Sequence, residues 1–310
     1  MAQANKISLL VHELPDGDAL GSAYGIKSFL NNKFPKKDVK IIGINDIKND
    51  FLEALFGLEK EKYDDEWISQ SLGIILDTAN EERILGQKHK LCKFLIRIDH
   101  HPYVNKVANI EWIDDLSSST CEMVTRLLNV WDHKRIDAHT SAFLYTGLLT
   151  DTNRFLHPNT TSDTLLIASL LSQTKFDKNR IHHILYTKSY DVYRYEKFLS
   201  DKIEFNTTTH IASLLIPKDA HLKFKIKEQT SMVHLLGGIT EFAIWTTLYY
   251  EPKLKNWKGS IRSYNIDVRP IAMKYHGGGH KFAVGFKLEN VNDFKKVIAD
   301  LATLTKKSKK

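Results

Sequence analysis

The stretch ISLLVHELPDGDALGSAYGIKSFLNNKF, residues 7–34, indicates a strand, a turn and a helix in direct succession. Residues 7–11 are mainly apolar and too few for a helix, so they predict a short buried strand. A helical pattern follows over 19–34. A strand that leads straight into a helix is the repeating unit of α/β folds.

The same alternation continues through the first half of the chain. Further strands are predicted at 39–44, 72–77 and 93–99, and helices at 120–131, 137–152 and 161–174. Ser119 and Glu122 have the spacing of a capping box at the start of one helix. Strands that alternate with helices predict an α/β fold with a mainly parallel sheet. Such sheets bind ligands beyond the carboxyl ends of their strands.

The pattern changes after about residue 185, which predicts a second domain. The polar and aromatic segment 186–206 is expected to be a helical linker. Beyond it we expect strands at 210–217 and 257–264, helices within 232–250 and at 267–275, and a glycine loop that enters a last strand over 277–288. We therefore predict two domains, 1–185 and a smaller α/β domain over 207–310.

The composition is that of a globular protein, with 42% hydrophobic and 26% charged residues among 310. The two cysteines, Cys92 and Cys121, are too few for a disulfide framework and indicate a reducing compartment. The sequence shows no signal peptide and no apolar run near the ~20 residues that span a bilayer. We expect a cytoplasmic protein without a membrane partner. The net charge of +7 favours an anionic partner but does not identify it.

Acidic and imidazole side chains gather where the predicted strands end. His12, Asp16 and Asp18 follow the first strand, Asp77 ends the third, Asp99, His100 and His101 end the fourth, and Asp151 follows a helix. Each alone has an ordinary explanation, because Asp favours turns and Asp-Gly pairs are common in them. Together they indicate a site, since the carboxyl ends of parallel strands share one edge of the sheet.

This donor set suits Mn2+ or a related divalent ion, and the absence of a cysteine cluster from the sequence argues against structural zinc. The potential ligands exceed what one ion usually takes from protein. Two ions about 3.5–4 Å apart, with one bridging carboxylate, would use them and would clamp the oxygens of a phosphoryl group.

The motifs also resemble a known family. HELPDGDALGS (12–22), LDTAN (76–80), RIDHHP (97–102) and GLLTDTNRF (147–155) resemble, in order and spacing, the four motifs of the DHH phosphoesterase superfamily. GSIRS (259–263) and GGGHKFAVG (277–285) resemble its DHHA1 domain. The resemblance implies a DHH catalytic, metal-binding domain followed by a DHHA1 substrate-binding domain. It is strongest to bacterial enzymes that act as oligoribonuclease and 3′-phosphoadenosine-5′-phosphate (pAp) phosphatase.

The resemblance implies a role for each motif residue. His12 and Asp16 would hold one Mn2+, Asp77 would bridge, and Asp18, His100 and Asp151 would hold the other, with Mg2+ or Co2+ as possible substitutes. Asp99 would orient His100 or add to the ligands, and His101 would face the reacting phosphate as a donor or an acid. Arg262 and the loop of Gly277, Gly278, Gly279 and His280 would hold the rest of the substrate.

The implied activity is hydrolysis of very short oligoribonucleotides (nanoRNA) to mononucleotides and of pAp to AMP. A phosphodiesterase for pApA or c-di-AMP is the alternative enzyme. An inorganic pyrophosphatase is disfavoured, because it needs no base-holding loop with Arg262. A non-catalytic module that binds single-stranded RNA is disfavoured, because it has no use for a complete ligand set. A homodimer is plausible for the family.

Three places depart from the family's usual pattern. Leu14 stands where Asn is frequent, His276 where a fourth glycine usually precedes the loop, and Asn153-Arg154 where a glycine-aromatic pair is commoner. None of them is an expected metal ligand. We expect any effect to fall on substrate preference.

Overall fold

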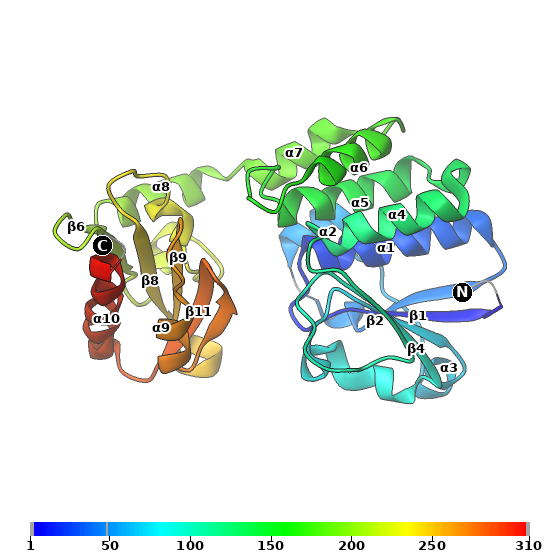
Figure 1. Ribbon diagram of the computed structural model, residues 1–310, viewed down its shortest axis with the longest axis horizontal. Coiled ribbons are helices and arrows are strands. Elements are labelled where there is room, and N and C mark those ends of the chain that lie inside the picture. Colours follow the sequence, from blue (N-terminus) through cyan, green and yellow to red (C-terminus); the bar gives the residue numbers. More distant parts are fainter. Residues whose placement is uncertain (1–2, 48, 308–310) are drawn as a thin grey trace. The chain divides into compact units, whose positions relative to one another are not determined.

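The computed structural model describes residues 3–47 and 49–307. The chain folds as two compact units that divide between Thr187 and Lys188 (Figure 1). Among the described residues, no helix combines the length and the apolar composition needed to cross a membrane.

The first unit is built on a parallel sheet, as predicted. Its strands are β1 (Lys6–Leu10), β2 (Asp38–Ile42), β3 (Leu72–Leu76), β4 (Phe94–Asp99) and β5 (Ile110–Ile113), in the order β2-β1-β3-β4-β5. Every neighbouring pair is parallel. The order reverses between β1 and β3, and open α/β sheets commonly bind ligands beside such a reversal, beyond the carboxyl ends of the strands. Strand β5 is an addition to the strands predicted from the sequence.

Helices cover both faces of this sheet. They are α1 (Gly17–Lys33), α2 (Asp50–Phe56), α3 (Asp65–Ser69), α4 (Thr120–Asp132), α5 (Ala138–Asp151), α6 (Ser162–Ser172) and α7 (Lys178–Tyr186). Figure 1 shows α1, α4 and α5 on one face and α3 on the other. The predicted helix over 19–34 begins earlier, at Gly17, because the Asp16 side chain caps it.

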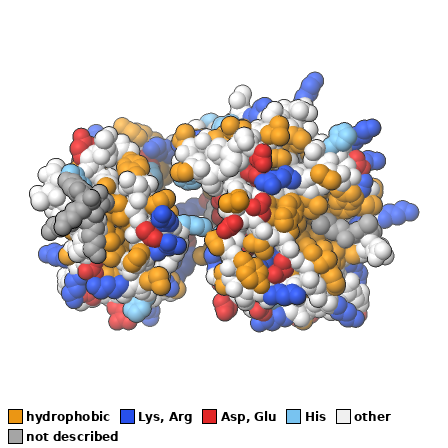
Figure 2. Space-filling view, viewed as in Figure 1, with side chains coloured by type: hydrophobic (Ala, Val, Ile, Leu, Met, Phe, Trp, Pro, Cys, Tyr) orange, Lys and Arg blue, Asp and Glu red, His pale blue; other side chains and the backbone are white. Residues whose placement is uncertain are grey.

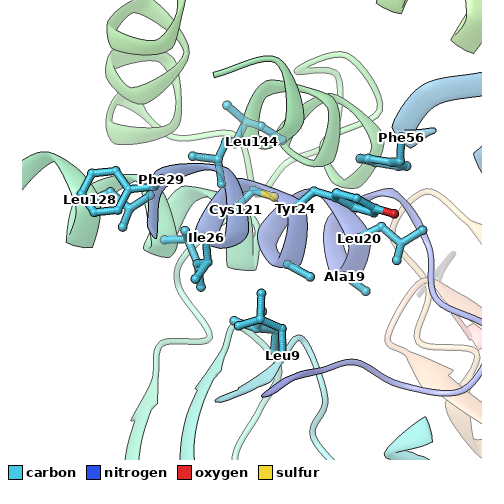
Figure 3. Close-up of a cluster of buried hydrophobic side chains, with 14 of the residues drawn as sticks. Leu9, Ala19, Leu20, Tyr24, Ile26, Phe29, Phe56, Cys121, Leu128 and Leu144 are labelled. Atoms are coloured by element: carbon cyan, nitrogen blue, oxygen red, sulfur yellow. The ribbon is translucent and has the colours of Figure 1, made fainter. Parts of the chain in front are cut away.

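The main core lies between the sheet and α5, with α1 in the middle. Leu9 points from β1 toward α1, and Leu144 of α5 approaches α1 from the other side (Figure 3). A Cβ on Gly21 of α1 would lie 2.7 Å from the Phe143 carbonyl oxygen, so only glycine allows this approach. The close packing of two antiparallel helices brings the start of α1 beside the end of α5, where Asp151 lies.

The second unit is built on a mixed sheet. Its strands are β6 (Glu204–Asn206), β7 (Ile211–Leu215), β8 (Ile244–Glu251), β9 (Asn256–Ser263), β10 (Gly278–His280) and β11 (Ala283–Leu288), in the order β10-β11-β9-β8-β7-β6. β7 and β8 are parallel and the other pairs antiparallel. Helices α9 (Arg269–Lys274) and α10 (Phe294–Lys307) contribute to the apolar core on one face, and α8 (Tyr190–Ser200) to the core on the other.

The predicted helix within 232–250 is wrong. The segment forms a short 3-10 turn at Val233–Leu236 and then strand β8. Gly237 and Gly238 interrupt any helix there, and the run IWTTLYY is rich in β-branched and aromatic residues that favour a strand.

Two further expectations concern the second unit. The predicted glycine loop at 277–280 is largely the edge strand β10. The predicted connection 186–206 is helical over α8, and Tyr195 and Leu199 of this helix are fully buried in the second unit. Helix α10 was not predicted. Residues 306–307 belong to α10, and 308–310 lie outside the described residues.

Candidate metal centre

The candidate site lies at the carboxyl edge of the first sheet, where the strand order reverses. His12 follows β1, Asp77 follows β3, and Asp99 is the last residue of β4. Asp77 has a left-handed backbone, with φ of 54°, which turns the chain sharply as the strand ends. Asp tolerates this region better than most residues, and such strain is concentrated at functional sites.

The structure brings the predicted ligands together in three overlapping groups. In each group, one donor atom per residue lies within 4.8 Å of the others. The groups are His12, Asp16 and Asp77; Asp18, His100 and Asp151; and Asp77, His100 and His101. Asp77 therefore links the first set to the side chains after β4, and His100 links Asp77 to the second set. Two neighbouring ions with a shared carboxylate fit this arrangement.

In His12 and His100, the contact of Nδ1 with a backbone carbonyl oxygen orients the ring, so that Nε2 faces the carboxylates. The Nδ1 of His12 lies 2.7 Å from the Glu13 carbonyl oxygen, and Nε2 then faces Asp77 at 3.7 Å. The Nδ1 of His100 lies 3.4 Å from the Ser117 carbonyl oxygen. Metal-binding histidines commonly donate one N–H to a carbonyl in this way, which leaves the other nitrogen as the ligand.

The Nε2 of His100 is surrounded by carboxylates. It lies 3.3 Å from Asp151 Oδ2, 3.4 Å from Asp77 Oδ1 and 3.9 Å from Asp18 Oδ2. A single nitrogen facing three carboxylates is the geometry expected around a shared cation position.

Helix α4 directs its N-terminus at the buried carboxylates. The backbone N–H groups of Thr120 and Cys121 donate to the two oxygens of Asp18 at 2.6 and 2.9 Å. The Thr120 hydroxyl donates to Asp77 at 3.1 Å. The positive end of the helix thus stabilises negative charge here. The predicted cap is also present, since the Ser119 hydroxyl accepts from the Glu122 N–H.

Asp16 serves the local structure as well. Its Oδ1 accepts hydrogen bonds from the backbone N–H groups of Asp18 and Ala19 at 2.9 and 3.1 Å, which caps α1. The turn explanation and the ligand explanation are therefore compatible for this residue. A cap leaves the second carboxylate oxygen available for a cation.

The crowded acids have displaced pKa values. Burial and the neighbouring Asp77 raise the pKa of Asp18 to about 7, and burial with Asp18 raises the pKa of Asp151 well above its usual value. Burial alone would raise the pKa of Asp77, but the hydrogen bond to His12 and the charge of His100 lower it to about 2. These carboxylates repel one another, and a divalent cation would relieve that repulsion.

An unsatisfied oxygen adds to the fit. Asp99 is 1% exposed, and its Oδ2 has no hydrogen-bond partner among the described residues. Its Oδ1 accepts from the His101 backbone N–H at 3.1 Å and lies 2.8 Å from His101 Nδ1. Buried polar atoms without partners are uncommon and often mark an ion or a catalytic role.

Sequence reasoning missed a supporting residue, Arg97. It is 1% exposed, and its guanidinium donates to the carbonyl oxygens of Ala79 and Asn105, both at 3.1 Å. Its Nε lies 3.2 Å from Glu111 Oε1. Arg97 therefore joins the loop after Asp77 to the loop after His101. A charged residue inside a predicted buried strand was the available signal.

In the second unit, Arg262 and His280 lie on the same face of the sheet. Arg262 on β9 pairs with Ala283 on β11, which pairs with His280 on β10. The Arg262 guanidinium donates to the carbonyl oxygens of Ile261 and Val284 at 2.9 and 3.2 Å. Burial lowers the pKa of Arg262. Of the predicted substrate residues, Arg262 and His280 therefore share one face of the sheet.

The departures from the family pattern share one backbone feature. Leu14 has φ of 57°, His276 55°, and the run Asn153, Arg154 and Phe155 has 44°, 63° and 65°. All five are left-handed, the conformation in which Gly and Asn are the least strained residues. Asn at position 14 and Gly at positions 153 and 276 would therefore have a conformational reason.

Comparison with known proteins places the chain in a family. Residues 6–150 match the DHH family, N-terminal domain, and residues 216–307 match the DHHA1 domain. The chain belongs to the DHH family and is a phosphoesterase hydrolase. It is 41% identical to the uncharacterised protein MG371 of Mycoplasma genitalium, over 96% of this chain and 90% of that protein.

Two further relatives extend the comparison. The chain is 31% identical to the bifunctional oligoribonuclease and PAP phosphatase NrnA of Bacillus subtilis, over 95% of this chain and 93% of that protein. A crystal structure of an exopolyphosphatase-related protein from Bacteroides fragilis superposes with a TM-score of 0.88 at 25% identity, covering 98% of this chain and 95% of that one. Members of this family use divalent metals, which agrees with the donor set described above.

Proposed function

We propose that the chain is a Mn2+-dependent phosphoesterase that hydrolyses very short oligoribonucleotides to mononucleotides and pAp to AMP. One observation carries the chemistry: the two ligand groups His12, Asp16, Asp77 and Asp18, His100, Asp151 meet at one sheet edge. The similarity to the Bacillus subtilis oligoribonuclease and PAP phosphatase supports the substrate class.

Mixed imidazole and carboxylate donors support Mn2+ over Mg2+, which takes oxygen ligands and retains water. Two divalent ions bound there would generate a nucleophile from water and neutralise charge on the phosphoryl oxygens. The protein orients the donor atoms toward the ions. His12 and His100 present Nε2 because each Nδ1 faces a carbonyl oxygen, and Asp77 faces both sets.

His101 is proposed to act on the substrate. Its Nδ1 is held by Asp99, so the opposite edge of the ring is presented in a fixed direction. From there it would donate to the reacting phosphate or protonate the leaving oxygen. In the second unit, Arg262 and the segment from Gly277 to His280 are proposed to hold the rest of the nucleotide.

The basic charge is not itself the argument for a nucleotide. Figure 2 shows Lys and Arg side chains spread over both units and mixed with acidic ones on the visible face. The proposal of a nucleotide substrate rests instead on Arg262, His280 and the relative's activity. Two free cysteines agree with a cytoplasmic site of action.

The test is a parallel assay in Mn2+ with pAp, pApA, a five-nucleotide RNA and c-di-AMP, each repeated in EDTA. Metal-dependent turnover of pAp and the short RNA supports the proposal. A preference for pApA or c-di-AMP retains the chemistry and assigns the alternative phosphodiesterase. No turnover of any substrate overturns the enzymatic proposal in favour of RNA binding, and Mg2+ and Co2+ in parallel test the choice of metal.

A further inference from the structure

Two glycines of the second sheet have no structural reason to be glycine. Gly278 on β10 and Gly285 on β11 are paired neighbours, and neither has a positive φ. A Cβ on Gly278 would meet no atom within 4 Å, and one on Gly285 only the Gly259 carbonyl oxygen at 3.7 Å. Gly277 differs, because its Cβ would lie 2.0 Å from the Gly285 carbonyl oxygen.

Glycine inside a strand weakens the strand. Because a side chain would fit at both positions, the presence of glycine there needs another explanation. Backbone without side chains allows a ligand to approach the sheet closely. Gly285 pairs in turn with Ser260 on β9. Gly278, Gly285 and Ser260 therefore form a row of very small residues, which we call the floor.

Cationic side chains lie on both sides of this floor. Residues two apart on a strand share a face, so Arg262 and Lys258 flank Ser260 on the same side of β9. Lys258 pairs with Lys287 of β11, and His280 pairs with Ala283 in the Arg262 row. On this face, Arg262 and His280 therefore lie on one side of the floor, and Lys258 and Lys287 lie on the other side.

The separation of the two rows indicates how much ligand fits between them. Arg262 and Lys258 are four residues apart on one strand, which is about 13 Å at about 3.3 Å per residue. Adjacent phosphates, with a single ribose between them, do not reach across that distance. Side chains of strand residues stand roughly perpendicular to the sheet, so a ligand that engages both rows needs at least one further nucleotide in between.

We propose that Lys258 and Lys287 form a second phosphate subsite, separated from the Arg262 subsite by the glycine floor, which receives a sugar or base. The inference rests on the proposed function and deepens it: this face distinguishes oligonucleotides of three or more residues from pAp and dinucleotides. Lys287 is exposed, and Lys258 is partly covered, with its Nζ 3.6 Å from Glu251 Oε2. A phosphate would compete with that single long ion pair.

The lysine test measures KM and kcat in Mn2+ for pAp, a dinucleotide and a five-nucleotide RNA. The double variant Lys258→Ala/Lys287→Ala is expected to raise the KM for the five-nucleotide RNA about tenfold more than the KM for pAp. Lys296→Ala is the matched control, since α10 packs on the opposite face of the sheet. Equal effects on all substrates, or none, would overturn the subsite.

The floor is tested by Gly285→Val. A β-branched residue suits an open strand position, so the variant is expected to unfold at the same or a higher urea concentration. Binding of the five-nucleotide RNA should nevertheless weaken about tenfold or more, because the side chain fills the floor. Unchanged RNA binding in a stable variant would contradict the assignment.

Binding is measured separately from turnover, so that the two proposals fail independently. The probe is a fluorescent five-nucleotide RNA with hydrolysis-resistant phosphorothioate linkages, titrated in Mn2+ at several salt concentrations. The double lysine variant should lose about 0.7 from the slope of log affinity against log salt for each phosphate no longer held. An unchanged slope overturns the subsite even if the enzyme is active, and a reduced slope supports it even if no substrate is hydrolysed.

Discussion

The Nδ1 of His101 lies 2.8 Å from Asp99 Oδ1, and the same oxygen accepts the His101 backbone N–H at 3.1 Å. Two bonds to one carboxylate oxygen fix both the ring and the peptide that carries it. Asp99 and Asp77 both favour the charged imidazole and raise the pKa of His101 against the opposing effect of burial. A histidine held in this way is equipped to donate a proton or a hydrogen bond.

We therefore expect His101→Ala to lower kcat by about 10²–10⁴-fold, the usual worth of a general acid or base. Asp99→Asn keeps an acceptor but loses the charge, and should cost about 10–100-fold. Steady-state kinetics with pAp and a short RNA check both values. Thermal stabilisation by Mn2+ should persist in both variants. Loss of that stabilisation would show that His101 holds the metal instead.

Asp77 occupies the position that connects the two ligand groups, so its removal should affect both. Asp77→Ala is expected to reduce activity to that of the EDTA-treated protein and to weaken Mn2+ binding measured by calorimetry. Asp132→Asn is a suitable control, because this carboxylate pairs with Lys33 away from the site. Full activity in Asp77→Ala would exclude a shared-carboxylate, two-ion mechanism.

Much of the first unit was predictable because its information is local. A short apolar run such as 7–11 is too short for a helix and therefore predicts a strand. The acidic residues that follow it then lie at the carboxyl edge of a parallel sheet. Prediction failed in the second unit at 232–250, where apolar residues fit a helix as well as a strand until Gly237 and Gly238 are considered.

The supporting residues of the site were not predictable for a different reason. Arg97 contacts Ala79 and Asn105, which are distant in sequence, and no local spacing reveals such contacts. Glu122 was expected to complete a capping box at Ser119. Its carboxylate instead accepts from the Ser118 hydroxyl and backbone N–H at 2.6 and 3.2 Å.

Glu122 allows a test of how the free energy of unfolding depends on pH in the acidic range. Burial alone would raise the pKa of Glu122, but hydrogen bonds from Ser118 and Thr164 and the ion pair with Arg126 lower it. A lowered folded-state pKa contributes stability that is complete above the ordinary Glu value of about 4.3 and is lost as pH falls through the folded value.

Glu122→Gln should therefore flatten the decline of unfolding free energy as the pH is lowered from about 5 to about 3. Urea denaturation at several pH values measures this, with the exposed Glu289→Gln as control. An unaltered decline in Glu122→Gln would mean that other groups govern acid unfolding.

Arg97 is expected to be essential for stability. Its guanidinium is buried, and Arg97→Met would leave two loop carbonyls without their donor and the Glu111 carboxylate without its cationic partner. Breaking a buried pair on one side costs about 3–5 kcal/mol of unfolding free energy. The double variant Arg97→Met/Glu111→Gln should recover part of that loss in urea denaturation. A single-variant loss below about 1 kcal/mol would contradict this role.

The residues with a left-handed backbone predict a substitution that increases stability. His276 follows the end of α9 with φ of 55°, and the Gly277 N–H then donates to the Ala272 carbonyl oxygen at 2.8 Å, as in a Schellman motif. Glycine is the preferred residue at the left-handed position of that motif, and an L-residue there is strained by roughly 1–2 kcal/mol. His276→Gly should therefore stabilise the second unit by about 0.5–1 kcal/mol, after the added chain entropy of glycine is subtracted.

Urea denaturation tests this stabilisation, and His276→Ala is the matched comparison, because alanine removes the imidazole but keeps the Cβ that causes the strain. Stabilisation by glycine and not by alanine would assign the effect to the backbone. Equal stabilisation by both would assign it to the imidazole. Kinetics on pAp and the five-nucleotide RNA then show what the strained histidine contributes: a KM that rises in both variants alike would mean that its side chain contacts the substrate, which would account for retaining it at a position that favours glycine.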